Sequence, residues 1–140
     1  IFHFDGFLLE VRGHEFGNTI ENFGDTVRRV LTAFSDADPY EAKCMRKSYI
    51  DKFGWWFEFN NEPIFVTTFA PCYPVSSSRY QFCNGNKDFE NSCYVLFQPE
   101  YSFGWRNIEC FKDPVTQWDN PTTLRDKIRV EYKNHGRSYE

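Results

Sequence analysis

Apolar residues that recur three and four positions apart predict helices in three parts of the chain. The longest stripe follows Asn22, its expected start, and consists of Phe23, Val27, Val30, Leu31 and Phe34. A second helix is expected to begin at Asp38, whose carboxylate can accept from the free N–H groups of a first turn, and to end at Gly54. The third stripe follows Asn120, its expected cap, and consists of Leu124, Ile128 and Tyr132.

The pattern changes to that of strands in the middle of the chain. The runs WWFEF at 55–59 and IFVTTFA at 64–70 flank a turn and predict a β-hairpin, because β-branched and aromatic residues dominate both. Further strands are expected at 7–11 and 92–98. Together these elements predict a single α+β domain over 1–140, in which helices pack on a small, mostly antiparallel sheet.

Composition narrows the classes of partner. Aromatic residues make up 20% of the chain, with 16 Phe, so rings can fill a core or line a flat apolar pocket. The net charge is −4, which argues against nucleic acid and anionic lipid as partners, since both need a positive field. No apolar run approaches the ~20 residues of a membrane span. A small-molecule substrate is the expected partner, and a homodimer or a subunit of a complex stays open.

Cysteine and histidine usage predicts neither a disulfide framework nor a zinc motif. The five cysteines form no CxxC pair: Cys44, Cys72, Cys83, Cys93 and Cys110. We interpret most of them as buried thiols of a reducing, cytoplasmic compartment, and a secreted protein with one or two disulfides stays open. No second histidine stands at ligand spacing from His14 or His135. His135 is interpreted as a helix-end residue, whereas the loop residue His14 is the better imidazole candidate for a site.

Most residues that could bind a ligand or act in catalysis lie in residues 70–82, APCYPVSSSRYQF, which we call the bend. It follows a buried strand and places three hydroxyls beside the guanidinium of Arg79, a set of donors suited to a carboxylate. Tyr73 and Tyr80 flank these donors with rings. The alternative is a capped polar turn with Arg79 on the surface. Cys72 is a candidate nucleophile, although no cysteine-protease signature surrounds it and a structural cysteine is the simpler interpretation.

The middle of the chain resembles the YqcI/YcgG family, in the version of its eukaryotic, fungus-like members. Its run FEFNNEPIFVTTFAPCYPVSSSRYQF follows the family pattern F-x-F-x-x-x-G-E-P-F-F-V-V-G-L-H-P-x-S-S-R. The later run YVLFQPEYSFGWR follows the pattern L-V-F-N-P-H-x-x-F-x-x-L-R. The resemblance covers roughly 55–106, and in these patterns Tyr73 and Glu100 replace two histidines of the family.

This resemblance implies a haem-dependent oxygenase that N-hydroxylates a guanidine or an amino-acid-derived substrate. The side chains expected to hold the haem propionates are Ser77, Ser78 and Arg79. Because the family histidine before proline is absent, the candidate iron ligands are Tyr73, Cys72 and His14. A second hypothesis is a non-catalytic domain of the same fold that acts as a binding module or as a subunit of a larger complex. A third is a cysteine-dependent enzyme that uses Cys72.

Overall fold

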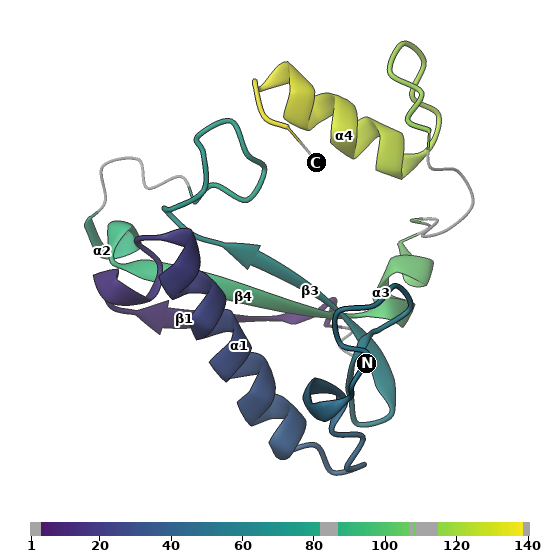
Figure 1. Cartoon of the computed structure of the whole chain (residues 1–140). Helices are drawn as coiled ribbons and strands as arrows, with labels where there is room; N and C mark the ends of the chain where they lie inside the picture. Colours follow the sequence, from purple (N-terminus) through teal and green to yellow (C-terminus); the bar gives the residue numbers. More distant parts are fainter. Residues whose placement is uncertain (1–3, 82–86, 107, 109–114, 139–140) are drawn as a thin grey trace.

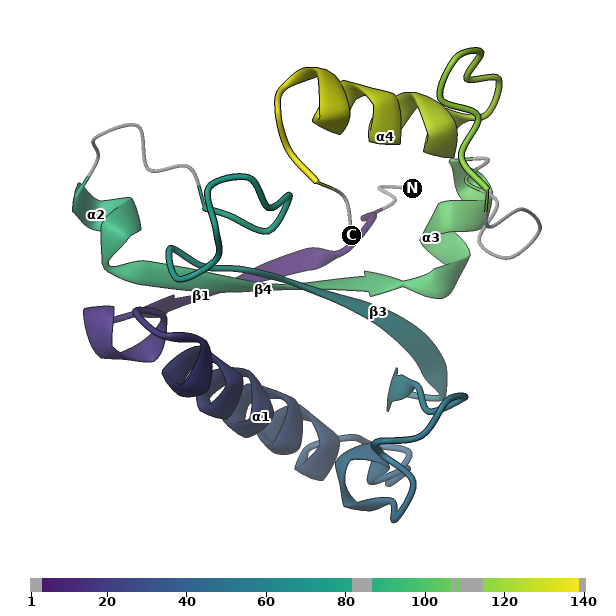
Figure 2. The same cartoon turned by 45° about the horizontal axis from the view of Figure 1, so that its top comes forward.

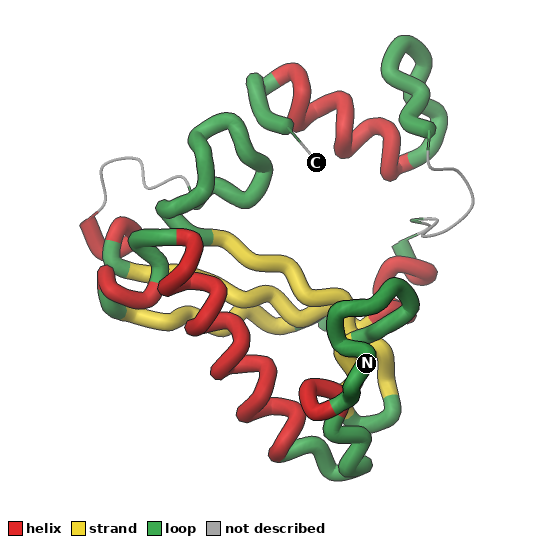
Figure 3. Tube along the Cα trace, in the orientation of Figure 1, coloured by secondary structure: helices red, strands yellow, loops and turns green. Residues whose placement is uncertain are grey.

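The computed structural model describes residues 4–81, 87–106, 108 and 115–138. Four strands form one antiparallel sheet in the order β1-β4-β3-β2 (Figures 1 and 3). Their bounds are Phe7–Arg12 for β1, Phe57–Phe59 for β2, Glu62–Phe69 for β3 and Ser92–Pro99 for β4. The predicted α+β class is confirmed, and β2 and β3 form the expected hairpin across Asn60 and Asn61, which both have positive φ.

Helices lie on both sides of this sheet (Figure 2). One face is covered by α1, and the other, which we call the far face, lies toward α3 and α4. The helices are α1 at Ile20–Asp36, α2 at Lys87–Glu90, α3 at Glu100–Trp105 and α4 at Leu124–Asn134. Two short 3-10 turns are η1 at His14–Phe16 and η2 at Cys44–Arg46. Within the described residues, no helix combines the length and the apolar character needed to cross a membrane.

Side-chain alternation along the strands places the core between the sheet and α1. On the central strand β4, Cys93, Val95 and Phe97 face α1 and are almost completely buried. The ring of Phe97 stacks on Phe34 of α1 and on Phe7 of β1, with centroids 4.8 and 4.7 Å apart. The predicted stripe of α1 therefore packs on the sheet as expected, because its apolar residues share one side of the helix.

The starts of both long helices differ by a few residues from the prediction. The hydroxyl of Thr19, not the side chain of Asn22, caps α1 by accepting from the backbone N–H of Asn22 at 3.1 Å. The hydroxyl of Thr123, not Asn120, caps α4 in the same way. A threonine hydroxyl in an extended backbone reaches the N–H two or three residues on, which satisfies one donor of the first turn.

The predicted helix from Asp38 to Gly54 is wrong. This segment consists of turns around η2, and Glu41 and Lys43 have positive φ values of 52° and 47°. The carboxylate of Asp38 accepts from the N–H groups of Tyr40 and Ala42, as a cap would, but also from Asn60 of the β2–β3 turn at 2.7 Å. This contact with a distant turn holds the segment in a non-helical path, so tertiary packing overrides the local start signal.

The same three N–H groups set the ionisation of Asp38. Burial of this carboxyl group favours its neutral form, but the hydrogen bonds from Asn60, Ala42 and Tyr40 outweigh that effect and lower its pKa. The buried Asp38 is therefore a carboxylate at neutral pH, and it ties the segment after α1 to the hairpin.

Candidate functional site

The bend closes on itself directly after β3. Of its residues, the structure describes 70–81. The N–H of Ala70 donates to the carbonyl of Arg79, and the N–H of Gln81 donates to the carbonyl of Ala70, each at 3.3 Å. The N–H of Ser77 donates to the carbonyl of Pro74 at 2.8 Å. These bonds fold the predicted polar loop into a compact turn that stands on the far face of the sheet (Figure 2).

The C-terminal segment is attached to the bend by backbone hydrogen bonds. The N–H of Ser78 donates to the carbonyl of Ser138 at 2.8 Å, and the N–H of Ser138 donates back to the carbonyl of Ser76 at 2.6 Å. The two segments are 60 positions apart in sequence, yet they pair like neighbouring strands. This pairing brings the end of α4 close to the bend.

A cavity of about 350 Å³ lies where the bend, the far face and the C-terminal segment meet, and we call it the bend cavity. Its volume is at the lower end of the ~300–1,000 Å³ that ligand pockets span. Its apolar wall is formed by Leu8, Phe69 and Phe89. Its polar lining is formed by Ser78, Tyr80, Gln81, Tyr94, Tyr132 and Arg137. Residues from four separate parts of the chain thus converge on one space.

Ser78 is the most informative residue of this lining. Its side chain is buried, with 3% of the residue exposed, and no hydrogen-bond partner for its Oγ exists among the described residues. Ser78 also lines the bend cavity. Because buried polar groups are nearly always hydrogen-bonded, an unpartnered hydroxyl beside a cavity makes that cavity the candidate site. In the same lining, the side-chain amide nitrogen of Gln81 donates to the carbonyl of Phe89.

Tyr94 is oriented by a carboxylate from the neighbouring strand. Its hydroxyl donates to Glu10 at 3.2 Å, and the hydroxyl of Ser92 donates to the same carboxylate oxygen at 2.8 Å. The Ser92 hydroxyl and then Arg12 lower the pKa of Glu10. Burial, and then the negative charge of Glu10, raise the pKa of Tyr94. Tyr94 is therefore a protonated phenol at neutral pH, and its ring is held in the wall of the bend cavity.

The residues predicted as iron ligands lie elsewhere. The ring of Tyr73 packs edge-on against Phe23 of α1, and its hydroxyl shares a hydrogen bond of 2.9 Å with Thr68, on the face of the sheet that α1 covers. Cys72 packs in the same cluster, and burial raises the pKa of its thiol. His14 is exposed on η1, where its Nδ1 lies 3.4 Å from the amide of Asn18.

The remaining predicted residues belong to the bend but make different contacts. Ser77 Oγ accepts from the N–H of Arg79 at 3.1 Å, which is a local turn contact. The guanidinium of Arg79 lies 6.0 Å from the centre of the Phe69 ring. Of the six candidate site residues, only Ser78 lines the bend cavity. The predicted site is thus divided by the sheet, with Cys72 and Tyr73 on one side and Ser78 on the other.

This arrangement does not fit haem as the resemblance implies it. None of Tyr73, Cys72 and His14 lines the bend cavity, and the thiol of Cys72 is disfavoured as a thiolate by burial. Among the residues that the structure describes, no three His, Cys, Asp or Glu side chains gather in a group that could hold a metal ion. The haem hypothesis therefore stays a prediction, without support from the geometry of its candidate ligands.

The structure adds residues to the site that the sequence pattern assigned to other roles. The sequence pattern assigns Tyr132 to an apolar helix stripe, and Arg137 stands a few residues after the end of that stripe. Tyr94 lies on the far-face positions of a strand whose alternate residues form the core. The excess of aromatic residues was a general signal for the two tyrosines, and no sequence pattern pointed to Arg137, because the convergence of these residues depends on how distant segments pair.

The three described cysteines, Cys44, Cys72 and Cys93, are free thiols. Cys44 and Cys93 are buried, and Cys72 is half-buried. Burial and then the nearby Cys72 raise the pKa of Cys93 to about 11. Cys83, Cys110 and His3 lie outside the described residues.

Comparisons with known proteins return no relative of this chain. No protein-family model, no curated protein and no solved structure matches it. The resemblance to the YqcI/YcgG family therefore stays a prediction, and the function is argued from the geometry of the site.

Proposed function

We propose that this protein is a small-molecule-binding domain whose ligand occupies the bend cavity, in line with the hypothesis of a non-catalytic binding module. The observation that carries this proposal is Ser78, a residue that lines the cavity and whose buried hydroxyl has no partner among the described residues. An unsatisfied buried polar group costs about 1–3 kcal/mol of stability. A ligand that accepts a hydrogen bond from Ser78 would recover part of this cost on binding.

The lining favours a flat ligand with hydrogen-bond acceptors. Tyrosine rings from the bend, from β4 and from α4 offer faces and edges on which an aromatic or otherwise planar group can pack: Tyr80, Tyr94 and Tyr132. The hydroxyl of Ser78 and the guanidinium of Arg137 are donors, and a guanidinium matches the two oxygens of a carboxylate. Aromatic carboxylates are therefore suitable first probes.

The test compares two serines of the same bend. Benzoate, phenylacetate and their amides are titrated into wild type, Ser78→Ala and Ser76→Ala by calorimetry and ligand-detected NMR. Ser76 is exposed, so it is a matched control. We expect Ser78→Ala to weaken binding about fivefold, the value of a hydrogen bond worth ~1 kcal/mol, and Ser76→Ala to leave it unchanged.

The stability of the Ser78→Ala variant, measured by urea unfolding, is a second test of the proposal. Because Ser78→Ala removes an unsatisfied buried hydroxyl, the ligand-free variant should be as stable as wild type or more stable, by up to ~1 kcal/mol in urea unfolding. A variant that binds less tightly but unfolds no more easily separates a ligand contact from a structural one. The proposal fails if no probe binds, or if both serine variants bind as wild type does.

Hemin is titrated along with these ligands, because the family resemblance implies a haem protein. A Soret band that appears with wild type and shifts in Tyr73→Phe, Cys72→Ala or His14→Ala would support the haem hypothesis instead. We expect no such residue-specific shift, since none of the three lines the bend cavity.

A further inference from the structure

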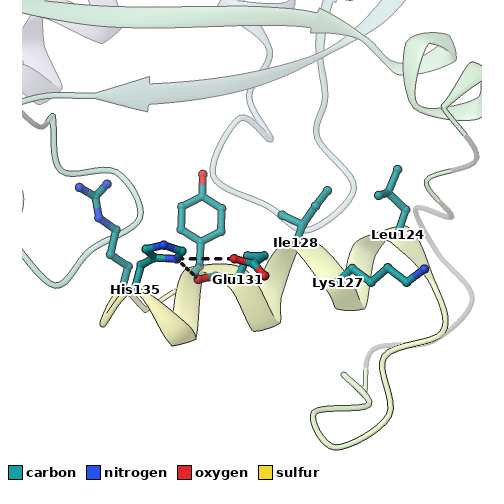
Figure 4. Close-up of a pocket in the computed structure, with 7 residues that line it drawn as sticks. Leu124, Lys127, Ile128, Glu131 and His135 are labelled. Carbon is teal, nitrogen blue, oxygen red and sulfur yellow. Dashed lines mark hydrogen bonds and ion pairs between the residues drawn. The ribbon is translucent and has the colours of Figure 1, made fainter.

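A second and larger hollow runs along α4. It has a volume of about 610 Å³ and is lined by side chains of α4 and the residues after it (Figure 4). Leu124 and Ile128 project from the helix toward the sheet and form its apolar floor. Leu124 remains 43% exposed although it belongs to the helix stripe that would ordinarily be sealed against a core. We call this hollow the α4 groove.

The polar residues of the α4 groove stand at its rim. The Nδ1 of His135 lies 2.8 Å from the carbonyl oxygen of Glu131 and 3.6 Å from its carboxylate, and both side chains are more than two-thirds exposed (Figure 4). Lys127 is also exposed. The charged groups at the rim stay in water, and aliphatic side chains line the floor. Such a surface is suited to binding an apolar chain.

The α4 groove adjoins the bend cavity. Tyr132 and Arg137 line both spaces, so a single molecule can contact both at once. One end of this combined space offers the buried Ser78 hydroxyl, and the other offers Leu124 and Ile128. The space is therefore polar at the bend and apolar along the helix, with a guanidinium at the junction.

We propose that the ligand is an amphiphilic carboxylate, with its carboxylate at Arg137 and Ser78 and its hydrocarbon chain in the α4 groove. This inference rests on the proposed function, because it assigns the class of ligand to the same bend cavity. A guanidinium and a hydroxyl donor match the two oxygens of a carboxylate, so an acid can make contacts at this end that an alcohol of the same length cannot make. The length of the α4 groove then selects acids with a chain over short ones.

The test is a chain-length series with matched head groups. Butanoate, hexanoate, octanoate and decanoate, and the corresponding alcohols, are titrated below their micelle concentrations into the full chain. We expect each added methylene that enters the α4 groove to tighten binding about fourfold, as its removal from water implies. The acids should bind more tightly than the alcohols of equal length.

Substitutions at Ile128 and Arg137 test where the two ends of the ligand bind. Ile128→Ser should flatten the dependence on chain length, whereas Ile20→Ser, at an exposed position of α1 on the other side of the sheet, should not. Arg137→Gln should remove the preference for acids over alcohols and keep the dependence on chain length. Ile128→Ala is measured as well and should flatten the series partly, and circular dichroism shows whether each variant is folded.

The outcomes separate this inference from the proposed function. Binding of benzoate that depends on Ser78, with no gain from longer chains, would overturn the amphiphile and leave the small-molecule site in place. Failure of every probe, benzoate included, would overturn both. Light scattering tests whether a second copy of the chain fills the α4 groove instead. A dimer that Ile128→Ser dissociates, together with no dependence of binding on chain length, would show this and would overturn the inference.

Discussion

The two faces of the sheet are built from the same strands but differ in how they are covered. On the face toward α1, the central residues Cys93, Val95 and Phe97 are at most 1% exposed. On the far face, Leu8 of β1 is 56% exposed and Phe65 of β3 is 44% exposed. Neighbouring positions in one strand therefore belong either to a close-packed core or to a surface with room for a ligand.

The difference follows from the elements that pack on each face of the sheet. The 17-residue helix α1 presents a continuous apolar stripe, so rings and branched side chains interdigitate with the sheet. The far face meets the bend, the short helix α3 and the 11-residue helix α4, whose end is held to the bend through Ser138. One face thus contributes most of the stability, and the other can keep a cavity because the fold does not depend on filling it.

The largest expected effect distinguishes the two faces directly. Phe97→Ala removes a ring from the close-packed core and should lower the free energy of unfolding by about 3–5 kcal/mol. Phe65→Ala removes the same ring from the far face, where it packs edge-on against Phe103, and should cost clearly less because the ring is already partly in water. Urea unfolding of both variants measures this. Equal losses would contradict the view that the faces differ in packing.

A smaller loss is expected when the segment after α1 is released from the hairpin. Asp38→Ala removes the acceptor of three N–H groups and should lower Tm, whereas Asp36→Ala breaks only an exposed ion pair with Arg46 and should change Tm little. Thermal unfolding followed by circular dichroism compares the two.

The pH dependence of Asp38 has a definite sign. Because its pKa is lowered in the folded state, its stabilising effect is present above the ordinary pKa of an aspartate and is lost as the pH falls through the lowered value. The stability difference between wild type and Asp38→Ala should therefore shrink in acid. A difference that stays constant down to strongly acidic pH would show that the carboxylate charge does not matter.

The smallest expected effect concerns cysteine reactivity on the packed face. Burial raises the pKa of Cys93 to about 11 and also raises that of Cys72, so both should stay thiols at neutral pH. Iodoacetamide should modify neither in the folded protein at neutral pH, and peptide mapping by mass spectrometry after denaturation should find both unmodified. Rapid alkylation of Cys72 would instead favour the hypothesis of a cysteine-dependent enzyme.

Local sequence patterns predicted most of the helices and strands correctly. The pattern of apolar residues located α1, α4 and the four strands of the described sheet to within a few residues, because the spacing of apolar residues indicates which side chains share a face. The segment after Asp38 was predicted wrongly, since its carboxylate has a partner, Asn60, that is 22 positions away. Caps were misplaced by a few residues, because several polar side chains near each start can play the same part.

The amino-acid sequence by itself determined the α+β class, the core stripe of α1 and the dense set of donors in the bend, since these depend on neighbours along the chain. Only the tertiary structure decided which of those donors belong together. It placed Cys72 and Tyr73 against α1, left Ser78 buried without a partner among the described residues, and brought Tyr132 and Arg137 to it. The reason is physical: a cavity exists where distant segments meet, and that meeting depends on long-range pairing such as the one between Ser78 and Ser138.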